Sequence, residues 1–192
     1  MPKSRRTFAV IAGSGVIGQF ELGKKVDLKT DYGRALAFEA RDGDYYVLPR
    51  HGPGHSVPPH MINYRANIAG LEDLGVEEII ATSAVGSMNK EFGVGQLGLV
   101  DQFLDFTKRR EGTFYNETAV HTDVTNPYSA LLNRKLMETA RRLRLKVRDG
   151  LVYVCTEGPR YESAAEVRMF RDLGGDVVGM TGLPEVVLAN EK

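Results

Sequence analysis

The residues best suited to chemistry gather in a loop that its glycines and prolines keep irregular. Residues 49–60 hold Arg50 and three of the four histidines of the chain, His51, His55 and His60. Because this composition forbids a regular helix, the side chains are not one face of an element, and such a loop favours a binding role. Arg50 and His51 are therefore predicted to bind an anion and a sugar. Zinc held by imidazoles and plainly solvated histidines are the alternatives, although the chain lacks a helical His-Glu-x-x-His motif.

Hydroxyl groups follow a short apolar stretch at residues 78–87, which reads Glu-Ile-Ile-Ala-Thr-Ser-Ala-Val-Gly-Ser. The apolar part suits a strand that is covered on both faces, and open α/β sheets bind ligands beyond the carboxyl ends of such strands. Thr82, Ser83 and Ser87 then supply hydroxyl groups, and Gly86 allows close approach to backbone N–H groups, as an oxyanion requires. A polar turn that merely caps its own backbone is the alternative.

A glycine-rich turn at residues 13–18 matches the pattern G-x-G-x-x-G. The dinucleotide interpretation requires a helix to begin there, but the next residues lack a sustained apolar stripe and are interrupted by Gly23. A turn that presents Ser14 to a single phosphate group fits the sequence better.

Composition excludes several classes of function. Twenty-five basic residues balance 25 acidic ones in a chain of 192 residues. The chain therefore lacks the net positive charge that is typical of proteins that bind nucleic acid or an anionic membrane. The single Cys155 permits no disulfide framework and favours a reducing cytoplasm. No apolar run approaches the roughly 18 residues of a membrane span, and the length fits one domain.

The hydrophobic pattern alternates short strands with helices, which indicates an α/β protein. A long loop at 108–127 is expected to be functional or packed against a partner. Strands are predicted at 8–12, 35–40, 45–48, 79–81, 97–106, 151–155 and 176–179, and helices at 61–74 and 129–145, from 163 and from 184.

Six short motifs together resemble the ordered signatures of the trimeric purine nucleoside phosphorylase and methylthioadenosine phosphorylase family. The resemblance implies a three-layer α/β/α fold with a twisted mixed sheet flanked by helices, and a homotrimer or a dimer of trimers. It also implies phosphorolysis of a purine nucleoside to the free base and ribose 1-phosphate or its 5-methylthio analogue, without a metal or cofactor. The motifs are Gly13-Ser14-Gly15, Arg50-His51-Gly52, residues 63–67, residues 82–87, residues 157–162 and residues 180–185.

The resemblance also assigns roles to single residues. Arg50 and His51 match the catalytic part of the phosphate site, and Ala84 would act there through its backbone N–H. Met180 matches a residue beneath the ribose, Tyr161 a ring that lines the nucleoside pocket, and His121 a loop residue lent to a neighbouring subunit. The complete phosphate set is Ser14, Arg50, His51, Ser83, Ala84 and Thr181.

Glu162 is the residue that bears on which purine base the protein prefers. Methylthioadenosine phosphorylases usually carry serine at the matching position, whereas Tyr161-Glu162 resembles enzymes for 6-oxopurines. A carboxylate accepts a hydrogen bond from N1–H of hypoxanthine, whereas adenine has no proton on N1. The loop lengths and Arg50-His51-Gly52 are shared with the methylthioadenosine branch, so both the base and the 5′ substituent stay open.

The resemblance ends within the last motif. Family members continue with more helix, a further strand bearing the Asn or Asp that contacts purine N7, and a closing helix, so residues 1–192 are expected to form one domain truncated at its C-terminus. A non-catalytic fragment that binds nucleoside or phosphate is therefore the alternative function. A nucleosidase that uses water is a third possibility, disfavoured because Arg50 would then have no anion to bind.

Overall fold

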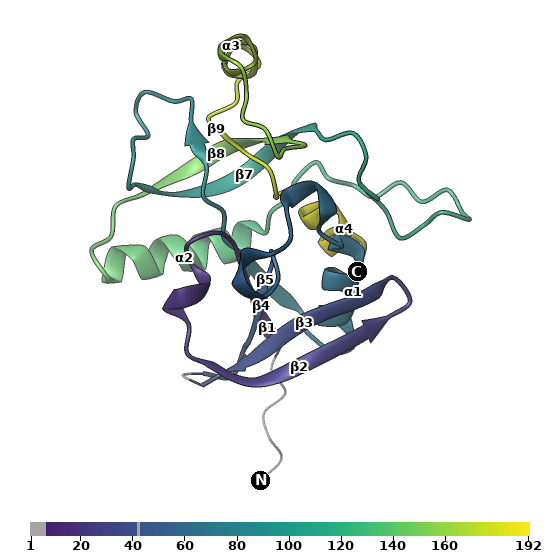
Figure 1. Cartoon of the computed structure of the whole chain (residues 1–192). Helices are drawn as coiled ribbons and strands as arrows, with labels where there is room; N and C mark the ends of the chain where they lie inside the picture. The colour runs from purple at the N-terminus through teal and green to yellow at the C-terminus, as the bar shows by residue number, and fades with distance from the viewer. Residues whose placement is uncertain (1–6, 42) are drawn as a thin grey trace. The chain divides into compact units, whose positions relative to one another are not determined.

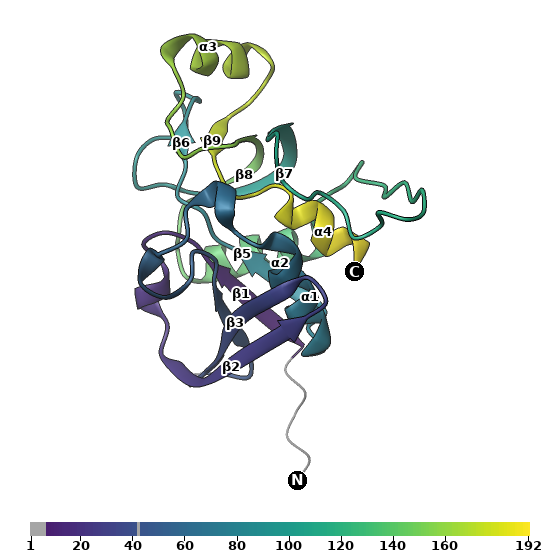
Figure 2. The same ribbon diagram turned by 45° about the vertical axis from the view of Figure 1, so that its right-hand side comes forward.

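The structure, a computed structural model, describes residues 7–41 and 43–192, and its chain forms two compact units. One unit contains Met1–Ala84 with Glu191–Lys192, and the other contains Val85–Asn190. Figure 1 and Figure 2 show the elements of each unit in two views.

The first unit is built on a five-stranded sheet of order β2-β3-β4-β1-β5. β1 pairs in parallel with β4 on one side and β5 on the other, whereas β2 and β3 form an antiparallel hairpin that extends the sheet beyond β4. The strands are β1 (Phe8–Ala12), β2 (Leu22–Thr30), β3 (Gly33–Ala40), β4 (Tyr46–Pro49) and β5 (Glu78–Ala81).

Helix α1 (Tyr64–Asp73) packs on β2 and β3 of this hairpin. Asn63 caps its N-terminus by accepting a hydrogen bond from Ala66 N at 3.0 Å, and the helix stops at Gly75, whose φ is +76°. A Cβ on Gly70 would lie 2.8 Å from the side chain of Leu28, so glycine lets the helix approach β2 closely.

The second unit is built on a four-stranded sheet of order β6-β9-β8-β7. Asp176 fastens this sheet, because its carboxylate accepts hydrogen bonds from Val152 N at 2.9 Å and from Asn89 Nδ2 at 2.7 Å. The elements are β6 (Gly86–Ser87), β7 (Leu97–Phe106), α2 (Ala130–Arg142), β8 (Val147–Thr156), α3 (Ala164–Asp172), β9 (Val177–Gly179) and α4 (Glu185–Glu191).

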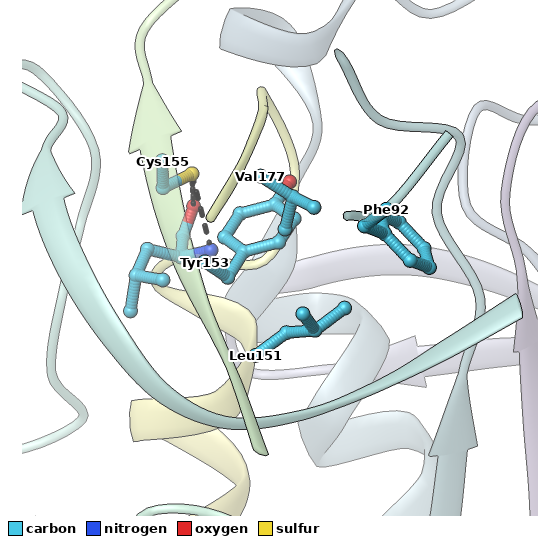
Figure 3. Packing of buried hydrophobic residues seen from close by; sticks show 6 residues of the cluster. Phe92, Leu151, Tyr153, Cys155 and Val177 are labelled. Carbon is cyan, nitrogen blue, oxygen red and sulfur yellow. Dashed lines mark hydrogen bonds between the residues drawn. The ribbon is translucent and has the colours of Figure 1, made fainter. Parts of the chain in front are cut away.

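Alternate side chains of β8 form the centre of the second core. Leu151, Tyr153 and Cys155 point to one face and are each at most 3% exposed, and Phe92 and Val177 pack against them (Figure 3). The second half of β8 is largely buried, so the residues that follow at its carboxyl end are held in place by packing.

Mixed sheets flanked by helices confirm the predicted α/β class, with one difference in pairing. Among the described residues, the strands form two sheets rather than one. β5 is the edge strand of the first sheet, and the next strand in the chain, β6, pairs with β9 in the second sheet. The strands predicted at 8–12 and 97–106 are confirmed at their exact bounds as β1 and β7.

Two expectations about local structure need correction. β2 was not expected, although Val26 and Leu28 alternate with charged residues as in a strand with one buried face. The helix expected from residue 61 begins at Tyr64, because Pro59 opens a short 3₁₀ turn before it.

The glycine turn after β1 leads into a 3₁₀ turn, Ile17–Gln19, and then into β2. No α-helix follows these glycines in residues 13–30, so the structure lacks the helix that the dinucleotide interpretation requires. Within the described part of the chain, no helix has the length and apolar character needed to cross a membrane.

Candidate active site

Three groups of predicted residues meet at one edge of the first sheet. β4, β1 and β5 are adjacent and parallel, and their ends are in register, with Ala12 opposite Pro49 and Ile11 opposite Ala81. The segments that follow these strands carry Ser14, then Arg50 and His51, then Ser83 and Ala84. The five phosphate residues predicted in this unit therefore emerge side by side beyond the carboxyl edge.

Arg50 is the buried positive charge of this edge. It is 2% exposed, and its Nη1 donates a hydrogen bond to the Thr82 carbonyl at 2.6 Å. A Cβ on Gly13 would lie 2.3 Å from that carbonyl oxygen and 2.7 Å from Nη1, so Gly13 is needed for the arginine to pass. Thr82 Oγ1 in turn accepts from Gly13 N at 3.0 Å, which ties the turns after β1 and β5 together.

His51 is buried beside Arg50, with 6% of its surface exposed. Its Nδ1 lies 2.9 Å from the Val57 carbonyl, which accepts the hydrogen bond and so assigns the ring proton to Nδ1. Nε2 is then the nitrogen that can accept from a substrate hydroxyl or, when the ring is charged, donate to an anion. The His55 ring stacks on it with centroids 4.1 Å apart.

A second group of predicted residues lies in the other unit, in the turn after β9. Thr181 is 7% exposed, and its backbone N–H donates to Tyr153 Oη at 3.2 Å, as does that of Gly182 at 3.3 Å. Cβ atoms on Gly179 and Gly182 would lie 2.3 and 2.9 Å from the Tyr153 side chain. Gly179 and Gly182 therefore leave room for the Tyr153 hydroxyl to accept hydrogen bonds from the backbone of the turn.

The turn after β8 lies against this second group. A Cβ on Gly158 would lie 2.7 Å from Met180 Sδ, and Gly158 has a φ of +67°, so both space and backbone angle favour glycine. Thr156 Oγ1 donates to Glu162 Oε1 at 2.6 Å. Met180, Thr181 and Glu162 are thus brought together by the ends of β8 and β9.

Arg110, a residue of the long loop at 108–127, makes hydrogen bonds to the turn after β8 and to the turn after β9. Its side chain is 2% exposed, and its guanidinium donates to Glu157 Oε1 at 3.3 Å and to the carbonyls of Glu157 at 2.8 Å and Thr156 at 3.2 Å. It also donates to the Leu183 carbonyl. Burial by itself raises the pKa of the Glu157 carboxyl, but backbone N–H donors and Arg110 hold that pKa below its usual value.

Cys155 is a packing residue of this region. Its Sγ accepts a hydrogen bond from Leu183 N at 3.4 Å (Figure 3). Burial raises the pKa of the thiol to about 11, against the opposing effect of Arg110. The thiol is therefore protonated at neutral pH and is not a nucleophile.

Two predicted residues are not gathered with the others. The Tyr161 side chain is 86% exposed, and His121 is exposed in the loop between β7 and α2. No three His, Cys, Asp or Glu side chains cluster as a possible metal site anywhere in residues 7–41 and 43–192. Sequence reasoning missed Tyr153, Thr156 and Arg110, and the unusual length of the 108–127 loop was the one available signal for Arg110.

The sequence profile of the Phosphorylase superfamily matches residues 7–192. The chain belongs to this superfamily. It is 51% identical to a probable 6-oxopurine nucleoside phosphorylase of Moorella thermoacetica, an alignment that covers 95% of this chain and 73% of that protein. It is 48% identical to a probable S-methyl-5'-thioinosine phosphorylase of Methanothermobacter thermautotrophicus, with coverage of 95% and 65%.

Solved structures agree with this membership of the Phosphorylase superfamily. The methylthioadenosine phosphorylase from Schistosoma mansoni in complex with tubercidin superposes with a TM-score of 0.90 and 31% identity, over 95% of this chain and 76% of that one. The chain thus spans about two thirds to three quarters of the length of these relatives. The matches confirm the resemblance that the six motifs indicate.

Proposed function

We propose that this protein catalyses the phosphorolysis of purine nucleosides, with inorganic phosphate as co-substrate and no metal or cofactor. The observation that carries the proposal is the register of β4, β1 and β5, which brings Ser14, the buried Arg50 and His51, and Ser83 to one sheet edge. Hydroxyl groups, backbone N–H groups and one buried cation are the donors that a phosphate dianion needs. The family resemblance, rather than the strand register, adds Thr181 to the proposed phosphate-binding residues.

The proposed mechanism rests on positioning and charge. Phosphate attacks the anomeric carbon while the glycosidic bond loosens toward an oxocarbenium-like transition state. Arg50 holds the phosphate, and because Arg50 is 2% exposed, water screens its charge little. The bound phosphate is thereby oriented toward the anomeric carbon before the glycosidic bond breaks. Met180 is proposed to lie beneath the ribose, and Tyr161 and His121 to border the nucleoside. His121 would do so in a neighbouring subunit of a cytoplasmic homotrimer.

Glu162 is proposed to select 6-oxopurines, and its carboxylate accepts from N1–H of hypoxanthine or guanine. The preference for inosine over adenosine is expected to fall by about tenfold or more in Glu162→Ser, because a hydrogen bond to a charged group contributes roughly 1.5–3 kcal/mol. The measurement is kcat/KM for both nucleosides, with and without a 5′-methylthio group. A parent protein that prefers adenosine would contradict the assignment.

The experiment that tests phosphorolysis itself is the rate of base release as phosphate is varied. The proposal expects the rate to rise and saturate with phosphate and to vanish without it. Equal release in phosphate-free buffer would identify a nucleosidase instead. Binding of nucleoside without any turnover would identify a non-catalytic binding protein.

A further inference from the structure

Thr156 makes the hydrogen bond that fixes the Glu162 carboxylate. It is the last residue of β8, and its Oγ1 lies 2.6 Å from Glu162 Oε1, a distance typical of a hydroxyl that donates to an ionised oxygen. The same hydroxyl lies 3.4 Å from the Gly179 carbonyl. One hydroxyl carries one proton, so the shorter, charged partner receives it.

The strand below holds Thr156 rigidly. Val154 and Cys155, the two residues before it, have no exposed surface, and Cys155 pairs with Gly179 of β9. Glu162, by contrast, lies in the turn before α3, outside any helix or strand. The hydrogen bond from Thr156 therefore ties the carboxylate of this turn to the end of a buried strand.

Within the described residues, Thr156 is the hydrogen-bond donor to Glu162. Arg160 interacts with Glu162 through charge, but its guanidinium is engaged by Glu166 at 2.7 and 2.8 Å. Thr156 thus takes one acceptor position on Oε1, and Oε2 is left as the oxygen that can accept from a ligand. An ionised carboxylate offers acceptors alone, so it pairs with a base that carries a proton on its ring nitrogen.

We propose that Thr156 is a positioning residue for base selection, which holds Glu162 so that its second oxygen accepts from N1–H of a 6-oxopurine. The proposal rests on the function proposed above for Glu162. The carboxylate oriented in this way discriminates against 6-aminopurines, because an adenine base places an unprotonated N1 against an acceptor and leaves both without a donor.

The test compares Thr156→Val, which keeps the shape and removes the hydroxyl, with Thr156→Ser, which keeps the hydroxyl. The ratio of hypoxanthine to adenine affinity, measured by calorimetry, is expected to fall roughly tenfold in Thr156→Val, as for loss of one charge-assisted hydrogen bond, and to be retained in Thr156→Ser. Unchanged melting temperatures and an unchanged KM for phosphate would show that the variants are folded.

A double-variant cycle separates this role from a general packing effect. With Glu162→Ser already present, Thr156→Val is expected to leave the affinity ratio unchanged, because there is no carboxylate to position. The proposal is overturned if Thr156→Val keeps the parent ratio while Glu162→Ser lowers it, or if Thr156→Ser loses the ratio as valine does. Base affinity does not depend on turnover, so failure of phosphorolysis would appear separately, as base release without phosphate.

Discussion

Replacing Arg50 with alanine is expected to raise KM for phosphate by roughly 10- to 100-fold, with a much smaller change in KM for the nucleoside. Arg50 is 2% exposed, so water screens its charge little. Losing a charge-assisted contact with the anion costs about 1.5–3 kcal/mol. Steady-state kinetics with each substrate varied in turn gives the comparison.

Two controls make the Arg50 result specific. Arg50→Lys keeps the charge but not the planar fork, and should recover part of the phosphate affinity. Arg34→Ala removes an exposed arginine of β3 and should change neither KM. A rise of equal size in both Michaelis constants for Arg50→Ala would contradict its placement at the phosphate.

Replacing Arg110 with methionine is expected to lower the free energy of unfolding by about 1–3 kcal/mol, the usual cost of leaving buried hydrogen-bond acceptors without their donor. Its side chain is 2% exposed, and the loss leaves the Glu157 carboxylate and the carbonyls of Thr156 and Leu183 without this donor. Denaturant unfolding measures the change.

Arg109 provides the matched control for this prediction, because it is the exposed neighbour of Arg110 in the same loop. Arg109→Met should change the free energy of unfolding by no more than about 0.5 kcal/mol. Glu157→Gln should cost less in the Arg110→Met background than in the parent, since the two groups form one pair. Equal costs for Arg109→Met and Arg110→Met would show that the guanidinium contributes little to stability.

Local sequence signals predicted much of the fold. The helix predicted from residue 163 is present as α3, and Ser163 and Glu166 form a capping box at its start, with both hydrogen bonds present. β2 was not predicted because Gly23 was taken to interrupt a regular element. Lys25 and Asp27 also lower the apolar content of this strand, which buries only one face. The division of the strands into two sheets depends on pairing between distant segments, which short-range patterns do not encode.

The candidate site shows the same limit. Arg50, Ser83 and Thr181 stand at strand ends where glycine and hydroxyl residues interrupt apolar runs, so they were recognisable in the sequence. The positioning roles of Arg110 and Tyr153 were not recognisable, because their partners lie 28 to 73 residues away along the chain. Such roles follow from the packing of β8 rather than from any motif.

The most direct test of the account is to follow pentose 1-phosphate and inorganic phosphate by phosphorus NMR, and hypoxanthine and ribose by proton NMR of the same sample, with inosine as the nucleoside. Phosphorolysis predicts that one pentose 1-phosphate appears and one inorganic phosphate disappears for each hypoxanthine released, and that no base is released when phosphate is omitted. Release of hypoxanthine with free ribose at an unchanged level of phosphate would contradict it.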